Sequence, residues 1–181
     1  MRTGAFSSIR GQVFVAILAL AGLLTVGVAC NKANANYKQN VKTALEQADL
    51  KDVTVSEDAD KNTITLGGKV HSEDAKAKAA SVAQASAGSR IIANEISVEP
   101  VGSEGEAKKM ESNLDDGIEN NFKAELISKG LDKEHIRYSA KNGVLTLKGS
   151  VKNPTQRQAA QEIAKNTPNV QQVVNELQIQ R

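Results

Sequence analysis

The same stretch of sequence occurs twice in this chain, and the repetition constrains its fold more than any other feature. TITLGGKV at residues 63–70 returns 81 residues later as VLTLKGSV at 144–151. The offset continues without a gap through 63–99 and 144–180, where eight of the 37 aligned positions are identical. A repeat of this length indicates one supersecondary unit built twice. We therefore expect two small domains of about 65 residues each, with cores of Ile, Leu, Val and Ala, because aromatic residues make up only 3% of the chain.

The residues that precede the repeats are typical of an export signal. Arg2 and Arg10 are followed by an uncharged apolar run at 13–29, which ends at Cys30, the only cysteine. This arrangement resembles a bacterial lipoprotein precursor, in which cleavage before the cysteine leaves it lipid-modified, and Asn31 then favours the outer membrane. An uncleaved anchor and ordinary signal cleavage are the alternatives. The predicted organisation is a signal at 1–29, a tether at 30–36, a first domain at 37–99, a linker at 100–112 and a second domain at 113–181.

Hydrophobic spacing predicts the order helix, strand, strand, helix, strand in both repeats. In the first repeat, Asn36 and Ser72 are expected to cap the two helices, and Gly88 to end the second one. In the second repeat, Ser112 is expected to cap a helix that Gly130 ends.

Turn chemistry fixes the expected strand pairing. Asn142-Gly143 predicts a two-residue type I′ hairpin, and Asn153-Pro154 predicts the start of the following helix. The hairpin makes an antiparallel pair, and the helical crossover can place the third strand parallel to a neighbour. The predicted fold class is α+β: two tandem αββαβ units, each with two helices packed on one face of a small three-stranded mixed sheet.

Gly68 and Gly149 occupy the same place in the two repeats, within a strand. Glycine inside a strand permits close approach of another backbone or a bulge, so both are interpreted as structural glycines. A phosphate-binding loop would need a longer glycine segment that leads into a helix.

Charge and motif content exclude several classes of function. Without residues 1–29 the chain has 21 basic and 21 acidic side chains, whereas nucleic-acid-binding domains are strongly basic. His71 and His135 do not align across the repeat, and a zinc site needs three or four ligands. No triad or nucleophile signature is present. We therefore expect no enzyme activity, cofactor, metal site or nucleic-acid partner.

Each repeat resembles a BON domain, the module of osmotically induced periplasmic proteins and nodulation proteins. The resemblance depends on the glycine-containing strands at 66–70 and 147–151, the alanine-rich helices that follow, and the Asn-Glu pairs at 94–95 and 175–176. It covers nearly all of residues 37–180. Together with the predicted signal, it resembles the dual-BON outer-membrane lipoproteins, in which the second domain binds anionic phospholipid.

The resemblance implies a lipid-anchored protein on the periplasmic side of the cell envelope that binds anionic phospholipid membrane through its second domain and supports envelope integrity. The second repeat is the more cationic, with 10 basic and 8 acidic side chains at 113–181 against 8 and 10 at 37–99. The alternative function is a protein-interaction or holdase-like factor in osmotic or envelope stress, with envelope proteins as partners. The candidate residues for anionic lipid are His135, Arg137, Lys148, Lys152 and Arg157, and Cys30 is the candidate for lipidation.

The hairpin register predicts where two of these cations lie. With Asn142-Gly143 at the turn, Arg137 falls opposite Lys148 on the outer face of the sheet, and like charges directly across a strand pair are destabilising. One interpretation is a solvated face with splayed side chains. The other is an anion site, where phosphate oxygens or acidic residues of the other repeat relieve the repulsion.

Overall fold

A computed structural model describes residues 36–180, which belong to one compact unit formed by residues 35–181. The predicted export signal, Cys30 and nearly all of the tether lie outside the described residues, so the structure does not test them. Among the described helices, none combines the length and the apolar character needed to span a membrane.

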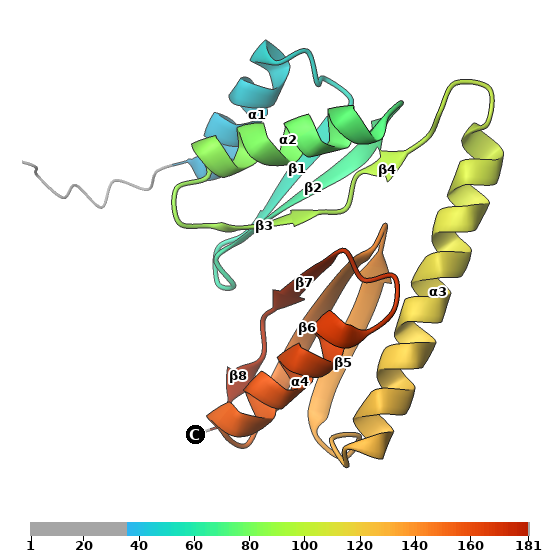
Figure 1. The fold of residues 1–181 in the computed structure, drawn as a ribbon. Coiled ribbons are helices and arrows are strands. Elements are labelled where there is room, and N and C mark those ends of the chain that lie inside the picture. The colour runs from blue at the N-terminus through green and yellow to red at the C-terminus, as the bar shows by residue number, and fades with distance from the viewer. Residues whose placement is uncertain (1–35, 181) are drawn as a thin grey trace, which may run out of the picture. The chain divides into compact units, whose positions relative to one another are not determined.

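The first domain is an α+β unit with the predicted order of elements (Figure 1). Its helices and strands are α1 (Tyr37–Gln47), β1 (Val53–Asp58), β2 (Thr63–Val70), α2 (Glu73–Ser86), β3 (Ile91–Asn94) and β4 (Ser97–Val98). Asn36 accepts from the Gln39 backbone N–H at the start of α1, and Ser72 does the same for Ala75 in α2, so both predicted caps are confirmed. β1 pairs antiparallel with β2, while β3 and β4 pair parallel with β2.

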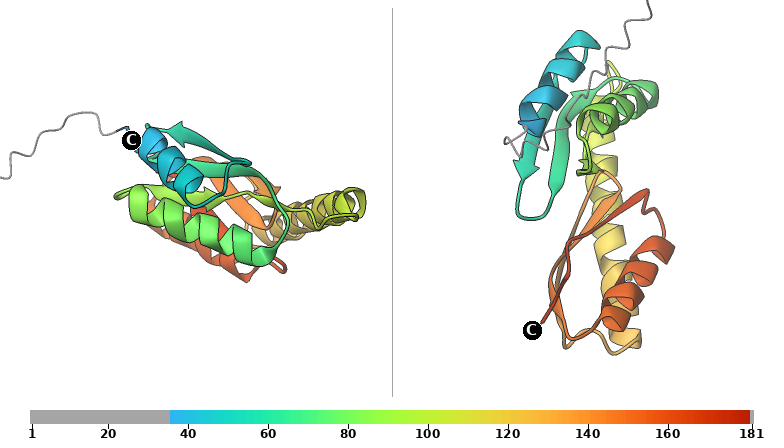
Figure 2. Two further views of the ribbon diagram at one scale, coloured as in Figure 1. Left: turned by 90° about the horizontal axis from the view of Figure 1, so that it is seen from above. Right: turned by 90° about the vertical axis from the view of Figure 1, so that its left-hand side faces the viewer.

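The second domain repeats this topology. Its elements are α3 (Glu104–Ser128), β5 (His135–Lys141), β6 (Val144–Val151), α4 (Pro154–Asn166), β7 (Gln172–Asn175) and β8 (Gln178–Ile179). Asn142 and Gly143 have φ values of 50° and 80°, as a type I′ turn requires, and Asn153 caps α4 with Pro154 at its start. In each domain the two helices lie on the same side of the sheet, which is best seen from the side (Figure 2). The α+β class and the tandem repeat are therefore confirmed.

Two sequence-based expectations need correction. The first helix of the second domain does not begin at Ser112, because α3 starts at Glu104 and is 25 residues long. Most of the segment expected as a linker is therefore helical. The expected third strand is also divided, into β3 and β4 in the first domain and β7 and β8 in the second, so each sheet has four strands.

The break in this strand has the same cause in both domains. Between β3 and β4, Ile96 is fully buried, and between β7 and β8 its counterpart Leu177 is 3% exposed. The irregular step lets these side chains enter the core, while the backbone N–H of Glu95 still donates to Leu66 and that of Glu176 to Leu147. The repeated Asn-Glu pair therefore marks the break in the third strand that lets a core side chain in.

Each domain has its own core. The first is built from α1, α2 and the inner face of its sheet, with Val41, Leu45, Ile64, Leu66, Ala79, Ala83 and Ile96 among the buried residues. The second contains Ile118, Phe122 and Leu126 from α3, packed against Leu145, Leu147, Val151, Ala160 and Ala164. The ring of Phe122 meets that of Tyr138 edge to face, with centroids 5.0 Å apart, and this contact positions α3 on the sheet.

The edge strands β3 and β7 also meet within the compact unit. Ala93, Val144 and Val174 form a third small buried cluster. The Gln172 side-chain amide accepts from the backbone N–H of Asn94 and donates to the carbonyl of Ile92, so it forms hydrogen bonds with two backbone groups of β3. The second domain thereby covers the edge of the first sheet at β3.

Candidate functional site

The predicted cationic stripe lies on the outer face of the second sheet, in the predicted register. Arg137 is opposite Lys148, Tyr138 is opposite Leu147 and His135 is opposite Ser150, which confirms the hairpin register. The corresponding pair in the first domain is Thr54 and Gly67, which carries no charge. The stripe is therefore a feature of the second domain alone.

The repulsion between Arg137 and Lys148 is relieved by a carboxylate of the same domain. Glu176 follows β7, and its side chain is 4% exposed. Its Oε2 lies 3.8 Å from Lys148 Nζ, which is an ion-pair distance, and has no hydrogen-bond partner. The predicted relief by phosphate oxygens or by acidic residues of the other repeat is not needed for Lys148, since Glu176 supplies the negative charge.

Lys152 is held in the same way. Its Nζ donates to Glu134 Oε1 at 2.9 Å, and the Glu134 side chain is only 6% exposed. The Gln156 amide donates to the same oxygen. The hydrogen bond from Lys152 is the main reason why the pKa of Glu134 lies below its ordinary value. The charge of Lys152 is therefore paired within the domain.

Arg157 is also engaged by its own domain. Its Nε donates to the carbonyl of Leu177 at 2.8 Å and its Nη2 to that of Asn175 at 3.4 Å. These bonds hold α4 against the β7–β8 step. Of the five candidate residues for anionic lipid, only His135 and Arg137 have exposed side chains with no ion pair in the part of the chain that the structure describes.

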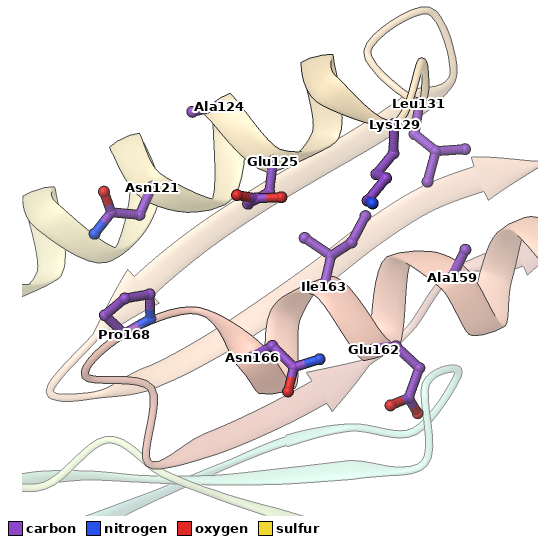
Figure 3. Close-up of a pocket in the computed structure, with 10 residues that line it drawn as sticks. All are labelled: Asn121, Ala124, Glu125, Lys129, Leu131, Ala159, Glu162, Ile163, Asn166 and Pro168. Atoms are coloured by element: carbon purple, nitrogen blue, oxygen red, sulfur yellow. The ribbon is translucent and has the colours of Figure 1, made fainter.

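A groove of about 860 Å³ lies on the opposite side of the second domain, between α3 and α4. Its apolar surface comes from Ala124, Leu131, Ala159, Ile163 and Pro168. Glu125 and Lys129 point from α3 toward Ile163 of α4 (Figure 3). The groove is thus an apolar channel between two helices, with charged groups of both signs at its rim.

An exposed isoleucine of α3 does not line this groove. Ile127, near the end of α3, is 54% exposed. Lys123 precedes it by one turn, so it lies on the same helix face, and it forms no ion pair among the described residues. Lys129 is not part of this face, because it points into the groove toward Ile163 (Figure 3). We call Lys123 and Ile127 the α3 patch. It combines a solvent-exposed apolar side chain with a cation that forms no ion pair among the described residues.

The two domains differ at this patch. The 81-residue offset places Lys42 at the position of Lys123, Glu46 at that of Ile127 and Ala48 at that of Lys129. Lys42 and Glu46 form an ion pair at 3.9 Å, so the corresponding surface of α1 is polar and compensated. The sequence analysis missed the α3 patch, although a comparison of exposed helix positions across the repeat would have revealed it.

Residues 36–180 contain no group of three or more His, Cys, Asp or Glu side chains placed to hold a metal ion. His71 uses its Nδ1 in a contact with the Glu99 carbonyl.

Comparison with known proteins agrees with the repeat. The model of the BON domain matches residues 33–100 and 114–181. No curated protein matches the chain. Two solved structures of CdsD, a structural protein of the type III secretion system of Chlamydia trachomatis, are similar at 10% identity. One covers 78% of this chain and 91% of its own with a TM-score of 0.36. The other, a C-terminal domain, covers 81% and 98% with a TM-score of 0.33.

Proposed function

The chain belongs to the BON domain family, with two copies in tandem, and from this premise we propose that it is a lipid-anchored protein of the bacterial cell envelope that binds anionic phospholipid membrane through its second domain and supports envelope integrity. BON domains are associated with phospholipid binding and with osmotic and envelope stress. Anchoring through Cys30 enters the proposal from the sequence alone.

The observation that carries the proposal is the α3 patch. An amphipathic helix at a membrane surface inserts apolar side chains between headgroups and places cations beside the anionic lipid phosphates. Ile127 and Lys123 present this combination, whereas Glu46 replaces the isoleucine in the first domain. The second domain is therefore the better candidate for contact with the membrane.

The expected strength of this contact is modest. Each cation near an anionic bilayer contributes about 1 kcal/mol, and full burial of an isoleucine contributes about 1.5–3 kcal/mol. A patch of this size gives weak, salt-sensitive binding, and a lipid anchor on Cys30 would keep the domain close enough to the bilayer for it to act.

The test is flotation of residues 31–181, which contain the whole described structure, with vesicles of phosphatidylcholine alone or mixed with phosphatidylglycerol. The decisive variant is Ile127→Glu, which gives this helix face of the second domain the Lys and Glu of the first. The comparison variant is Arg137→Thr, because replacing Lys148 would also leave the buried Glu176 without its nearest cation.

We expect the wild-type protein to float with the anionic vesicles only, the α3 variant to lose about tenfold or more in affinity, and Arg137→Thr to retain most of it. The reciprocal variant, Glu46→Ile, should strengthen binding by adding a second patch beside Lys42. Equal binding to neutral and anionic vesicles, or an α3 variant that binds like the wild type, would refute the proposal. A loss confined to Arg137→Thr would assign the contact to the outer sheet face instead.

A further inference from the structure

A second groove lies where the N-terminal half of α3 passes the first domain, within the compact unit of residues 35–181. Its volume is about 390 Å³, which is within the range of small-molecule sites. One wall is a stripe along α3, and the facing wall is the end of the first sheet. The apolar lining consists of Ala107, Met110, Leu114 and Ile118 from α3, with Val98 and Pro100 opposite. We call it the interdomain groove.

The apolar stripe of α3 continues beyond the core that it serves. Ile118 is fully buried, but Leu114 is 45% exposed and Met110 is 66% exposed, although all three belong to one face of the helix. The extension of α3 is not a simple spacer, because Glu111 accepts from the backbone N–H of Val98 and from the hydroxyl of Ser97. Apolar side chains are therefore held along a groove that the two domains leave open.

Lys76 of α2 also lines this groove. The residue is 8% exposed, and its Nζ donates to the carbonyl of Asn142 at 3.2 Å. No carboxylate lies within ion-pair distance of it in the part of the chain that the structure describes. An ammonium group has three N–H donors, and a buried charge is normally paired with an opposite one. Lys76 thus has room for an anionic partner.

The acidic residues around the groove do not form an ion pair with Lys76. Both carboxylate oxygens of Asp115 accept backbone N–H groups, from Asn142 at 2.7 Å and Gly143 at 3.1 Å, and those of Glu111 are bound to β4. Glu73 stands in the first turn of α2, where the helix dipole favours it. These contacts leave the Lys76 ammonium as the uncompensated cation of the groove.

We propose that the interdomain groove binds a free single-chain fatty acid, with its carboxylate on Lys76 Nζ and its acyl chain along the α3 stripe. The carboxylate pairs with the buried ammonium, and the acyl chain covers the exposed side chains of Met110 and Leu114. Each chain has one such site, because the counterpart of Lys76 in the second domain is Arg157, which is bound to the carbonyls of Asn175 and Leu177. The site is separate from the α3 patch and does not depend on the proposed membrane binding.

The test is isothermal titration of residues 31–181 with laurate and with lauryl alcohol, which has the same chain but no charge. Lys76→Met removes the ammonium and keeps an apolar stem, while Leu114→Gln changes the wall at an exposed position. The matched control is Ile91→Gln, because Ile91 is 40% exposed and does not line the groove.

We expect the wild-type protein to bind one laurate, about tenfold or more tightly than the alcohol. Lys76→Met should bind both with equal, low affinity, Leu114→Gln should weaken both, and Ile91→Gln should change neither. Circular dichroism checks that each variant is folded. If Lys76→Met does not fold, the binding measured for Leu114→Gln decides whether the proposal holds. Absence of laurate binding by the wild type, or wild-type affinity in the folded variants, overturns the proposal. Flotation with anionic vesicles should be unaffected by Leu114→Gln, which separates this site from the proposed membrane contact.

Discussion

Replacing Gly149 by alanine should destabilise the second domain more than any ordinary surface change. Gly149 has a φ of +104°, a region that residues with a Cβ rarely adopt, and a Cβ built there would overlap the carbonyl oxygen of His135 in the partner strand. The carbonyl belongs to the backbone and cannot move without β5, which is paired with β6 along its whole length. Gly68 meets the Asp52 carbonyl in the same way, so the constraint belongs to the repeat.

The magnitude follows from two contributions. Backbone strain at such a φ costs about 1–3 kcal/mol. Moving β5 away breaks or lengthens one or two ladder hydrogen bonds, each of which contributes about 1 kcal/mol. We therefore expect Gly149→Ala to lose about 2–5 kcal/mol of the free energy of unfolding. The loss can be measured by urea titration of residues 31–181 followed by circular dichroism. Hydrogen exchange of the β6 amides should show that the loss lies in the second domain.

The control is another glycine of the same domain. Gly117 lies inside α3, and a Cβ there would meet no atom within 4 Å. Gly117→Ala should therefore raise the free energy of unfolding by up to about 1 kcal/mol through helix propensity. A loss of less than about 1 kcal/mol for Gly149→Ala, which is the size of a typical point mutation, would show that the two strands do not approach each other as described.

Two further predictions concern the anchor and the response to acid. Cys30→Ala should release the protein from the membrane fraction into the soluble fraction or leave an uncleaved precursor, and unchanged membrane retention with palmitate labelling would contradict lipidation at this residue. Glu134→Gln should reduce stability at neutral pH, because the hydrogen bond from Lys152 lowers the folded-state pKa of Glu134 from 4.5. The contribution of the Glu134 carboxylate to the free energy of unfolding is complete above pH 4.5 and is lost as the pH falls through the lower folded-state pKa. Urea midpoints of wild type and variant should therefore converge in acid, and a difference that is independent of pH would exclude this linkage.

The order of elements was predictable because it depends on local chemistry. Asn36, Ser72 and Asn153 cap helices with their own side chains, and Asn142-Gly143 imposes a type I′ turn whatever surrounds it. Once that turn is set, the period of two along a strand fixes the opposition of Arg137 and Lys148. The start of α3 was not predictable in this way, because Ser103 makes no side-chain capping bond and the extension is held by Glu111 on β4, a contact between segments of different domains.

The sequence by itself therefore determined the repeat, the turns, the caps and the strand register, since each depends on residues within a few positions of one another. Only the tertiary structure decided which charges are available. Lys148, Lys152 and Arg157 look like free cations in the sequence, but Glu176, Glu134 and two backbone carbonyls come to them from distant segments. The exposure of Ile127 and the burial of Lys76 are also decided by the tertiary structure. Exposure and pairing depend on what the rest of the chain covers, and no local pattern carries that information.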